Sequence, residues 1–148
     1  MTARDTFAFF HPLRVRWAEV DAQGIVFNPN YFVYFDVGMT EYMRAIGYPY
    51  PERLKALGSD FFAVNATANF LASAHYDDQL DIAIRVAKIG RTSFTFGMAI
   101  FRNGTLLVEG SLTYVNAMIS TRSPTPLPED FLARILAHER TVPERRAG

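Results

Sequence analysis

The chain has 148 residues, a length typical of one domain, and its 15 basic residues balance its 15 acidic residues. That balance provides no overall field to attract nucleic acid, so no nucleic-acid partner is expected. Cysteine is absent, which excludes disulfides, thiol nucleophiles and cysteine-ligated zinc. A hydrophobic fraction of 49% with 13 phenylalanines predicts a well-filled core and apolar surface left for a partner.

Localisation signals and common catalytic motifs are also missing from the pattern. The apolar run at residues 7–10 is too short for a signal-peptide core, and no apolar stretch approaches the ~20 residues of a membrane span. The three histidines lack zinc-site spacing, and neither GxSxG nor a nucleotide-binding glycine motif occurs. We therefore expect a cytoplasmic, metal-free protein with one domain, residues 1–148, and no membrane segment.

The first predicted elements are a strand, a turn and a long helix. Residues 13–17 alternate apolar and basic side chains, the period of a half-exposed strand. A turn follows at Asp21–Gly24, and helical spacing then runs from Asn30 to Ile46. The apolar face of this helix is expected to comprise Phe32, Phe35, Met39, Tyr42, Met43 and Ile46. Its only continuous polar stripe consists of Asp36, Thr40 and Arg44.

The ends of this helix are marked in the sequence. Asn28 can cap it, Pro29 suits the first turn because proline lacks an N–H, and Gly47 suits the left-handed position after the last turn. A helix with so little polar surface is expected inside the protein.

The second half of the chain has the period of antiparallel strands. Asn103-Gly104 is a strong signal for a two-residue hairpin. The predicted strands are residues 61–72, 80–89, 92–101 and 106–115, with a short helical turn at 52–57 and a terminal helix at 129–140. This order predicts an α+β fold in which a curled antiparallel sheet wraps the long central helix. Dimerisation is expected to cover the surface that one sheet leaves open.

The segment around the start of the long helix carries the chemistry. A helix N-terminus presents unpaired N–H groups with partial positive charge, which can stabilise an oxyanion. Asp21 lies on a loop that folds back toward that end, where its carboxylate can attack a carbonyl or activate a water. Gly24 allows close approach of the loop backbone, and Phe27 with Tyr31 can line an apolar slot. Taken alone, however, an Asp-Ala-Gln-Gly segment is also an ordinary turn, and Glu19 is expected to be a solvated charge.

The string DAQGIVFNPNYFVYFD, residues 21–36, resembles the signature of 4-hydroxybenzoyl-CoA thioesterase and its acyl-CoA thioesterase relatives, which have the hotdog fold. The segments AHYDDQLDI, residues 74–82, and GRTSF, residues 90–94, also look like that family. The resemblance covers nearly the whole chain. It implies hydrolysis of an acyl-CoA thioester without a metal or cofactor, coenzyme A being part of the substrate, by a homodimer or homotetramer with its pocket at the subunit interface.

The resemblance also implies roles for single residues. Asp21 matches the catalytic carboxylate, as nucleophile or general base, and the backbone N–H near Asn28 matches the oxyanion donor. Asp36 matches a carboxylate that faces the ring hydroxyl of an aryl substrate. At the position of Asn28, relatives acting on aliphatic acyl groups often have histidine instead. Among the basic residues, we take Lys88 and Arg91 as candidates to bind the phosphates of coenzyme A, with Arg102 and Arg122 as further possibilities.

Three alternatives stay open from the sequence. A hotdog hydratase needs a histidine in the pocket, for which His11 or His75 must serve. The chain can also be a non-catalytic module that binds acyl-CoA. If the chain is a thioesterase, a helix carboxylate such as Glu41 can be the base in place of Asp21.

Overall fold

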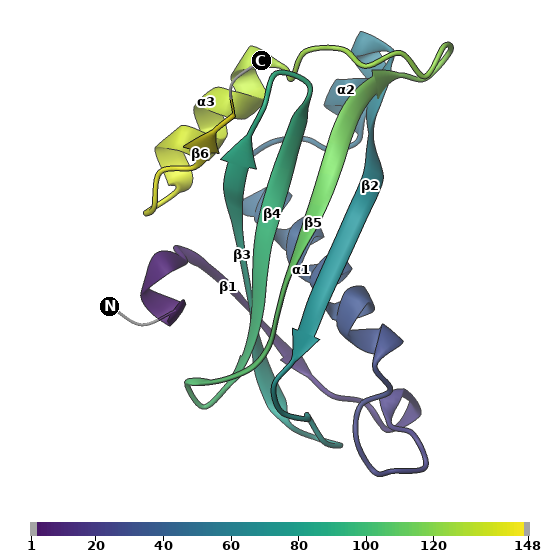
Figure 1. Ribbon diagram of the computed structural model, residues 1–148, viewed down its shortest axis with the longest axis vertical. Helices are drawn as coiled ribbons and strands as arrows, with labels where there is room; N and C mark the ends of the chain where they lie inside the picture. Colours follow the sequence, from purple (N-terminus) through teal and green to yellow (C-terminus); the bar gives the residue numbers. More distant parts are fainter. Residues whose placement is uncertain (1–2, 147–148) are drawn as a thin grey trace.

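The computed structural model describes residues 3–146 and contains a long helix wrapped by a curled antiparallel sheet, as predicted (Figure 1). The strands are β1 (Phe9–Arg14), β2 (Ser59–Phe70), β3 (Gln79–Ile89), β4 (Ser93–Arg102), β5 (Thr105–Met118) and β6 (Glu144–Arg145). The α-helices are α1 (Pro29–Ala45), α2 (Glu52–Leu57) and α3 (Glu129–His138), and 3₁₀ turns occur at Ala3–Thr6 and Trp17–Glu19. Within the described chain, no helix is long and apolar enough to cross a membrane.

The sheet has the order β1-β3-β4-β5-β2, and β6 adds a short parallel pairing with β3. All other neighbours are antiparallel. Asn103 and Gly104 both have positive φ, 49° and 79°, which confirms the predicted hairpin between β4 and β5. In Figure 1, α1 runs behind the strands, along the inner face of the sheet.

One face of helix α1 is buried, because its aromatic and sulfur-containing side chains pack into the main core, while the opposite face remains exposed in one chain. Gly38 permits the closest approach to the sheet, since a Cβ there would meet Ile82 Cγ2 at 2.6 Å. Phe32 was expected in the buried face but is 38% exposed, while Tyr31 and Tyr34 are buried instead. The inner face of the helix is therefore rotated toward the tyrosines at its first turns. The predicted polar stripe is exposed.

The caps of α1 follow the prediction only in part. Pro29 opens the helix, and Gly47, with φ of 72°, follows its last residues. The Asn28 side chain, however, makes no capping hydrogen bond, so the expected cap is wrong. Asn28 itself has helical backbone angles, φ −54° and ψ −35°, rather than the extended conformation that aims a cap side chain at the N–H groups of the first turn.

The first strand also differs from its predicted bounds. It lies at Phe9–Arg14 rather than at residues 13–17. Residues 17–19 form a 3₁₀ turn, because the Glu19 carboxylate accepts the Arg16 backbone N–H at 2.7 Å and closes the chain into a turn there. The alternating pattern of the sequence thus continues beyond the point where the strand ends.

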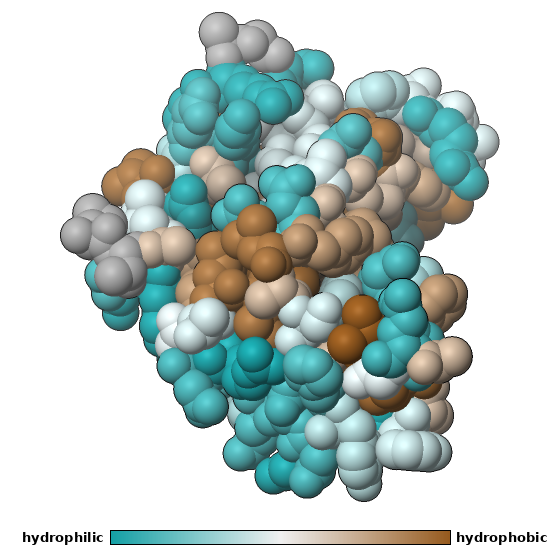
Figure 2. Space-filling view, turned by 60° about the horizontal axis from the view of Figure 1, so that its bottom comes forward, coloured by the Kyte–Doolittle hydropathy of each residue, from teal (hydrophilic) through white to brown (hydrophobic). Residues whose placement is uncertain are grey.

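Two surfaces of the sheet stay apolar. The outer edge of β2 has no neighbouring strand in the described chain, and Val64 and Phe70 on this strand are 60% and 51% exposed. On the side of the sheet away from α1, a second small hydrophobic cluster forms around Phe7 and Phe101. Figure 2 shows hydrophobic residues gathered near the middle of the face it presents, with hydrophilic residues around them.

Candidate active site

Glu19 organises the segment that leads into α1. The residue is only 8% exposed, and its side chain receives hydrogen bonds from the Arg16 guanidinium at 2.8 Å and from the Tyr34 hydroxyl at 3.0 Å. Burial alone would raise the pKa of the Glu19 carboxyl, but these donors and the Arg16 N–H together hold that pKa below its ordinary value. The expectation that Glu19 is a solvated charge is therefore wrong.

The backbone carbonyl of Glu19 also accepts hydrogen bonds, and these join the loop to the helix. It accepts the Phe27 backbone N–H at 2.9 Å and the Asn30 side-chain amide at 3.0 Å. Residues 19–27 consequently form a narrow hairpin, in which Val20 pairs with Val26 and the Asp21 N–H donates to the Ile25 carbonyl at 2.9 Å. Gly24, with φ of 78°, supplies the left-handed residue of its turn.

Asp21 is partly exposed and only one of its carboxylate oxygens is engaged. Oδ1 accepts the Gln23 N–H at 2.8 Å, which is the turn-forming role expected of aspartate in this context. Oδ2 has no hydrogen-bond partner within residues 3–146. The carboxylate is thus oriented by one oxygen and leaves the other available for a reacting group.

The start of α1 offers donors close to this loop. Asn28 is exposed, and within the described chain its N–H donates to no protein atom. The Glu19 carbonyl accepts both the Phe27 N–H and the Asn30 side-chain amide, so the loop of Asp21 is held against the first turn of α1. A 17-residue helix adds its dipole to that end.

The two aromatic residues predicted to line one slot lie in different surroundings. Phe27 is 51% exposed, whereas Tyr31 is 3% exposed and its hydroxyl accepts the Ala74 N–H at 3.0 Å. Tyr31 therefore connects the helix to the segment that precedes β3, and Phe27 is left to face solvent or a partner.

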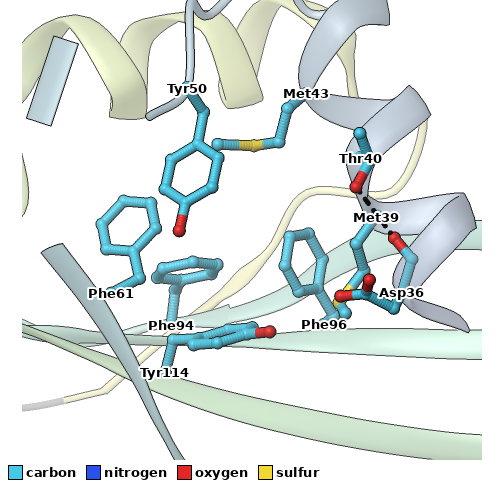
Figure 3. A pocket seen from close by; sticks show the side chains of 9 residues that line it. All are labelled: Asp36, Met39, Thr40, Met43, Tyr50, Phe61, Phe94, Phe96 and Tyr114. Carbon is cyan, nitrogen blue, oxygen red and sulfur yellow. Dashed lines mark hydrogen bonds between the residues drawn. The ribbon is translucent and has the colours of Figure 1, made fainter. Parts of the chain in front are cut away.

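A cavity of about 90 Å³ opens beside the second half of α1 (Figure 3). Asp36 and Thr40 stand on its helix side, and aromatic rings from the sheet face them. Burial raises the pKa of the Tyr114 hydroxyl in its wall, and the Asp36 charge adds to that rise. The lining residues are Asp36, Met39, Thr40, Met43, Tyr50, Phe61, Phe94, Phe96 and Tyr114. Asp21 and its loop are not among them.

The two basic residues predicted to bind phosphates lie far from Asp21 along the chain's own sheet. Lys88 is near the end of β3, and Arg91 follows in the next turn. The loop of Asp21 contacts the segment before the beginning of β3, about 30 Å away at 3.3 Å per strand residue. One chain therefore does not bring these residues to its own Asp21 loop.

Sequence reasoning missed the ionic contacts behind the loop. Glu19 follows Arg16 at the spacing of a capping box, which was the available signal. The pair Arg102–Asp78, at 2.7 Å, joins residues 24 positions apart and leaves no local pattern. Among the described residues, no group of three or more metal-ligating side chains is assembled.

Comparison with known proteins identifies the architecture. The family model of the thioesterase superfamily matches residues 23–109, which is more than half of the chain. The chain belongs to the thioesterase superfamily. The expectation of a hotdog-fold thioester hydrolase is thereby confirmed.

Individual relatives agree with this assignment. The chain is 28% identical over 130 residues to the acyl-CoA thioester hydrolase YbgC of Escherichia coli, covering 87% of this chain and 96% of that protein. In structure it resembles a 1,4-dihydroxy-2-naphthoyl-CoA thioesterase from Synechocystis, with a TM-score of 0.80, 19% identity and coverage of 86% and 94%. It also resembles the gentisyl-coenzyme A thioesterase BH1999, with a TM-score of 0.76, 24% identity and coverage of 86% and 99%. These two structures establish likeness of fold.

The buried carboxylate of Glu19 leads to a stability prediction. Replacing Glu19 with glutamine should lower the free energy of unfolding by about 1–3 kcal/mol at pH 7, because a nearly buried carboxylate loses its charge and with it the full strength of its hydrogen bonds from Tyr34 and Arg16. Since the pKa of Glu19 is lowered in the folded state, its stabilisation is present above the ordinary value of 4.5 and is lost as the pH falls through the folded-state pKa. The difference between wild type and Glu19→Gln, measured by urea unfolding, should therefore shrink in acid.

Glu41→Gln provides the matched control for this measurement. Glu41 pairs with Arg44 three residues along the same helix, but the Glu41 side chain is 33% exposed, against 10% for the side chain of Glu19. Loss of the pair with Arg44 should cost less than about 1 kcal/mol. Equal effects of the two substitutions at pH 7 would contradict a special role for Glu19.

Proposed function

We propose that this thioesterase hydrolyses an acyl-CoA substrate by means of Asp21 and the N-terminus of α1. The observation that carries the proposal is the pairing of an oriented carboxylate, with Oδ2 unengaged, and an unpartnered Asn28 N–H at the start of a long helix. A thioester carbonyl needs a nucleophile or an activated water on one side and a hydrogen-bond donor for its developing negative charge. One such donor typically contributes ~3–4 kcal/mol to the transition state.

Two routes use the same atoms. In the first, Asp21 attacks the carbonyl carbon, coenzyme A leaves as its thiolate, and water then hydrolyses the acyl-aspartate anhydride. In the second, the carboxylate takes a proton from a water that attacks the carbonyl directly. In both, Gln23 holds Oδ1 so that Oδ2 faces the reacting group.

Asp21→Asn tests this proposal directly. The variant keeps the turn hydrogen bond through its amide oxygen but has neither a nucleophilic nor a basic carboxylate, so kcat should fall by about 100-fold or more. The measurement is release of free thiol from a panel of acyl-CoAs, with circular dichroism and gel filtration to verify the fold. Glu41→Gln should retain its activity. The reverse result, an active Asp21→Asn and an inactive Glu41→Gln, would assign the base to the helix carboxylate instead.

We further propose that the acyl group is a hydroxylated aryl ring held in the cavity beside Asp36. The cavity of about 90 Å³ is of the order of an engineered apolar cavity of about 150 Å³ that binds benzene. Aromatic rings and methionines line it, and Asp36 provides one carboxylate acceptor. The two structural neighbours described above are named for dihydroxynaphthoyl and gentisyl substrates, which are hydroxyaryl acyl groups.

Asp36→Ala tests the choice of acyl group. Asp36 is exposed on α1, so the substitution should leave the fold intact. Loss of a hydrogen bond to a charged acceptor, about 1.5–3 kcal/mol, should lower kcat/KM for 4-hydroxybenzoyl-CoA by roughly 10–100-fold. Benzoyl-CoA, which lacks the hydroxyl, should be hydrolysed at the wild-type rate. A preference of the wild-type enzyme for medium-chain acyl-CoAs would contradict the aryl proposal but would not affect the proposed role of Asp21.

The cavity and the catalytic loop of one chain lie too far apart to share a substrate. Asp36, the cavity residue proposed to face the ring hydroxyl, stands eight residues beyond Asn28 in the same helix, which is about 12 Å at 1.5 Å per residue. A hydroxybenzoyl group is shorter than this. A complete site therefore requires two copies of the chain.

We propose a homodimer formed by the free edge of β2. Residues 61–72 contain no charged side chain, and the exposed Val64 and Phe70 lie within them, so this edge has none of the charges that usually prevent pairing. Antiparallel pairing of β2 with its copy about a twofold axis runs the two α1 helices in opposite directions. The start of α1 in one copy then lies beside the second half of α1 in the other. The same arrangement brings Lys88 and Arg91 of a partner toward the coenzyme A end of the substrate.

Hybrid dimers test whether the site is shared. Thr40 is an exposed position on α1, and tryptophan there should fill the cavity and abolish turnover of aryl substrates. Asp21→Asn should abolish catalysis by removing the carboxylate. When equal amounts of the two variants are unfolded and refolded together, half of the dimers contain one chain of each variant. Each such hybrid has one site in which both the Asp21 carboxylate and the cavity are intact. Recovery of about a quarter of the wild-type activity is expected. If the mixture has only the summed activity of the two variants, each site uses residues of one chain.

A further inference from the structure

Arg102 donates hydrogen bonds to both ends of the short segment Ser73–Asp78. It is the last residue of β4, and its side chain is 29% exposed. Its Nη1 donates to the Asp78 carboxylate at 2.7 Å and to the Ser73 carbonyl at 3.1 Å. Burial would raise the pKa of Asp78, but the hydrogen bonds from Arg102 and from the His75 N–H hold it below its ordinary value. The segment is therefore closed by a charged contact as well as by its own turn.

This segment supports the loop of Asp21 from outside. The Val26 N–H donates to the Ala74 carbonyl at 2.9 Å, and Ile25 pairs with His75 in a β-bridge. Within residues 3–146, the other backbone partners of these two loop residues are Val20 and Asp21, in the same hairpin. The segment Ser73–Asp78 is thus the neighbour that fixes where the hairpin lies.

The same segment is joined to the helix that supplies the oxyanion donor. The Ala74 N–H donates to the Tyr31 hydroxyl in the first turn of α1. The charges of Arg102 and Asp78 influence the pKa of that hydroxyl in opposite directions, after the larger contribution of burial. Ala74 therefore has one hydrogen bond to the loop of Asp21 and one to α1.

We propose that Arg102 is a positioning residue for thioester hydrolysis. Through Asp78 and Ser73 it holds the segment that sets the distance between the Asp21 carboxylate and the first turn of α1. This inference rests on the proposed role of Asp21. It differs from the sequence-based expectation that Arg102 meets a phosphate of coenzyme A, because it assigns the role of Arg102 to the internal contacts of Nη1 with Ser73, His75 and Asp78.

Arg102→Met tests the proposal with an uncharged side chain of similar reach. A displacement of the hairpin by about 1 Å should lower kcat by roughly 100-fold, because the reacting groups lose their alignment. KM should stay within about twofold, since substrate-binding residues are unchanged. Hydrogen exchange should accelerate at Val26, whose N–H bond to Ala74 reports the contact, and remain unchanged in the middle of α1.

Two further variants complete the experiment. Arg102→Lys retains a charged donor and should recover a substantial part of kcat and of the Val26 protection. Arg4→Met removes a partly exposed ion pair of similar kind, Arg4–Asp81 at 3.1 Å, from the 3₁₀ turn at the start of the chain, and should leave kcat and exchange unchanged. Thermal unfolding of all variants separates local loosening from global destabilisation.

The outcomes distinguish this inference from the proposed function. If Asp21→Asn is inactive while Arg102→Met has wild-type kcat, the positioning role is wrong and the function stands. A rise in KM at unchanged kcat would also overturn it and assign Arg102 to binding of coenzyme A. A loss of kcat without faster exchange at Val26 would overturn it as well. An active Asp21→Asn would remove the proposed function, on which the inference rests.

Discussion

The buried contacts of Glu19 are the constraint on which the geometry of the site depends. A carboxylate and a carbonyl of one residue together tie the end of the first strand, the hairpin and the start of α1 to a common point. Such a contact is strong because the partners are charged or buried, and it is costly to leave half satisfied. It makes the loop a defined hairpin, in which Asp21 Oδ1 accepts the Gln23 N–H and Oδ2 is left for the reaction that we propose.

The second consequence comes from the burial of α1. A helix packed inside a curled sheet has its N-terminus at one end of the molecule and its second half against the aromatic interior. The donors and the cavity are therefore separated by the length of the helix itself. In our proposal a second copy resolves this separation, because antiparallel helices bring opposite ends together. The exposed edge of β2, which has no charged side chain after Asp60, offers the surface for that pairing.

The contacts around Asp21 are compatible with both a turn-forming role and the catalytic role that we propose. Asp21 performs the ordinary role of aspartate in a turn with Oδ1, as the simplest interpretation of its sequence context requires. The same hydrogen bond fixes the direction of Oδ2. The structural interpretation and the proposed catalytic one therefore describe two atoms of one side chain, so the two roles are compatible.

The sequence by itself determined the period of its elements, and this was enough for the fold. Alternation along β3 and β4, the signal at Asn103-Gly104 and the apolar α1 are local patterns that depend on neighbours two to four residues apart. The motif at residues 21–36 also indicated the family, which the comparisons confirmed.

Only the tertiary structure decided the burial of Glu19, the exposure of Phe27 and Phe32, the pairing of Arg102 with Asp78 and the distance of Lys88 from Asp21. These features depend on which segments meet after the sheet has formed. The free energy of a charged side chain is set by the partners and the water around it in space, and its neighbours in the sequence contain little information about either.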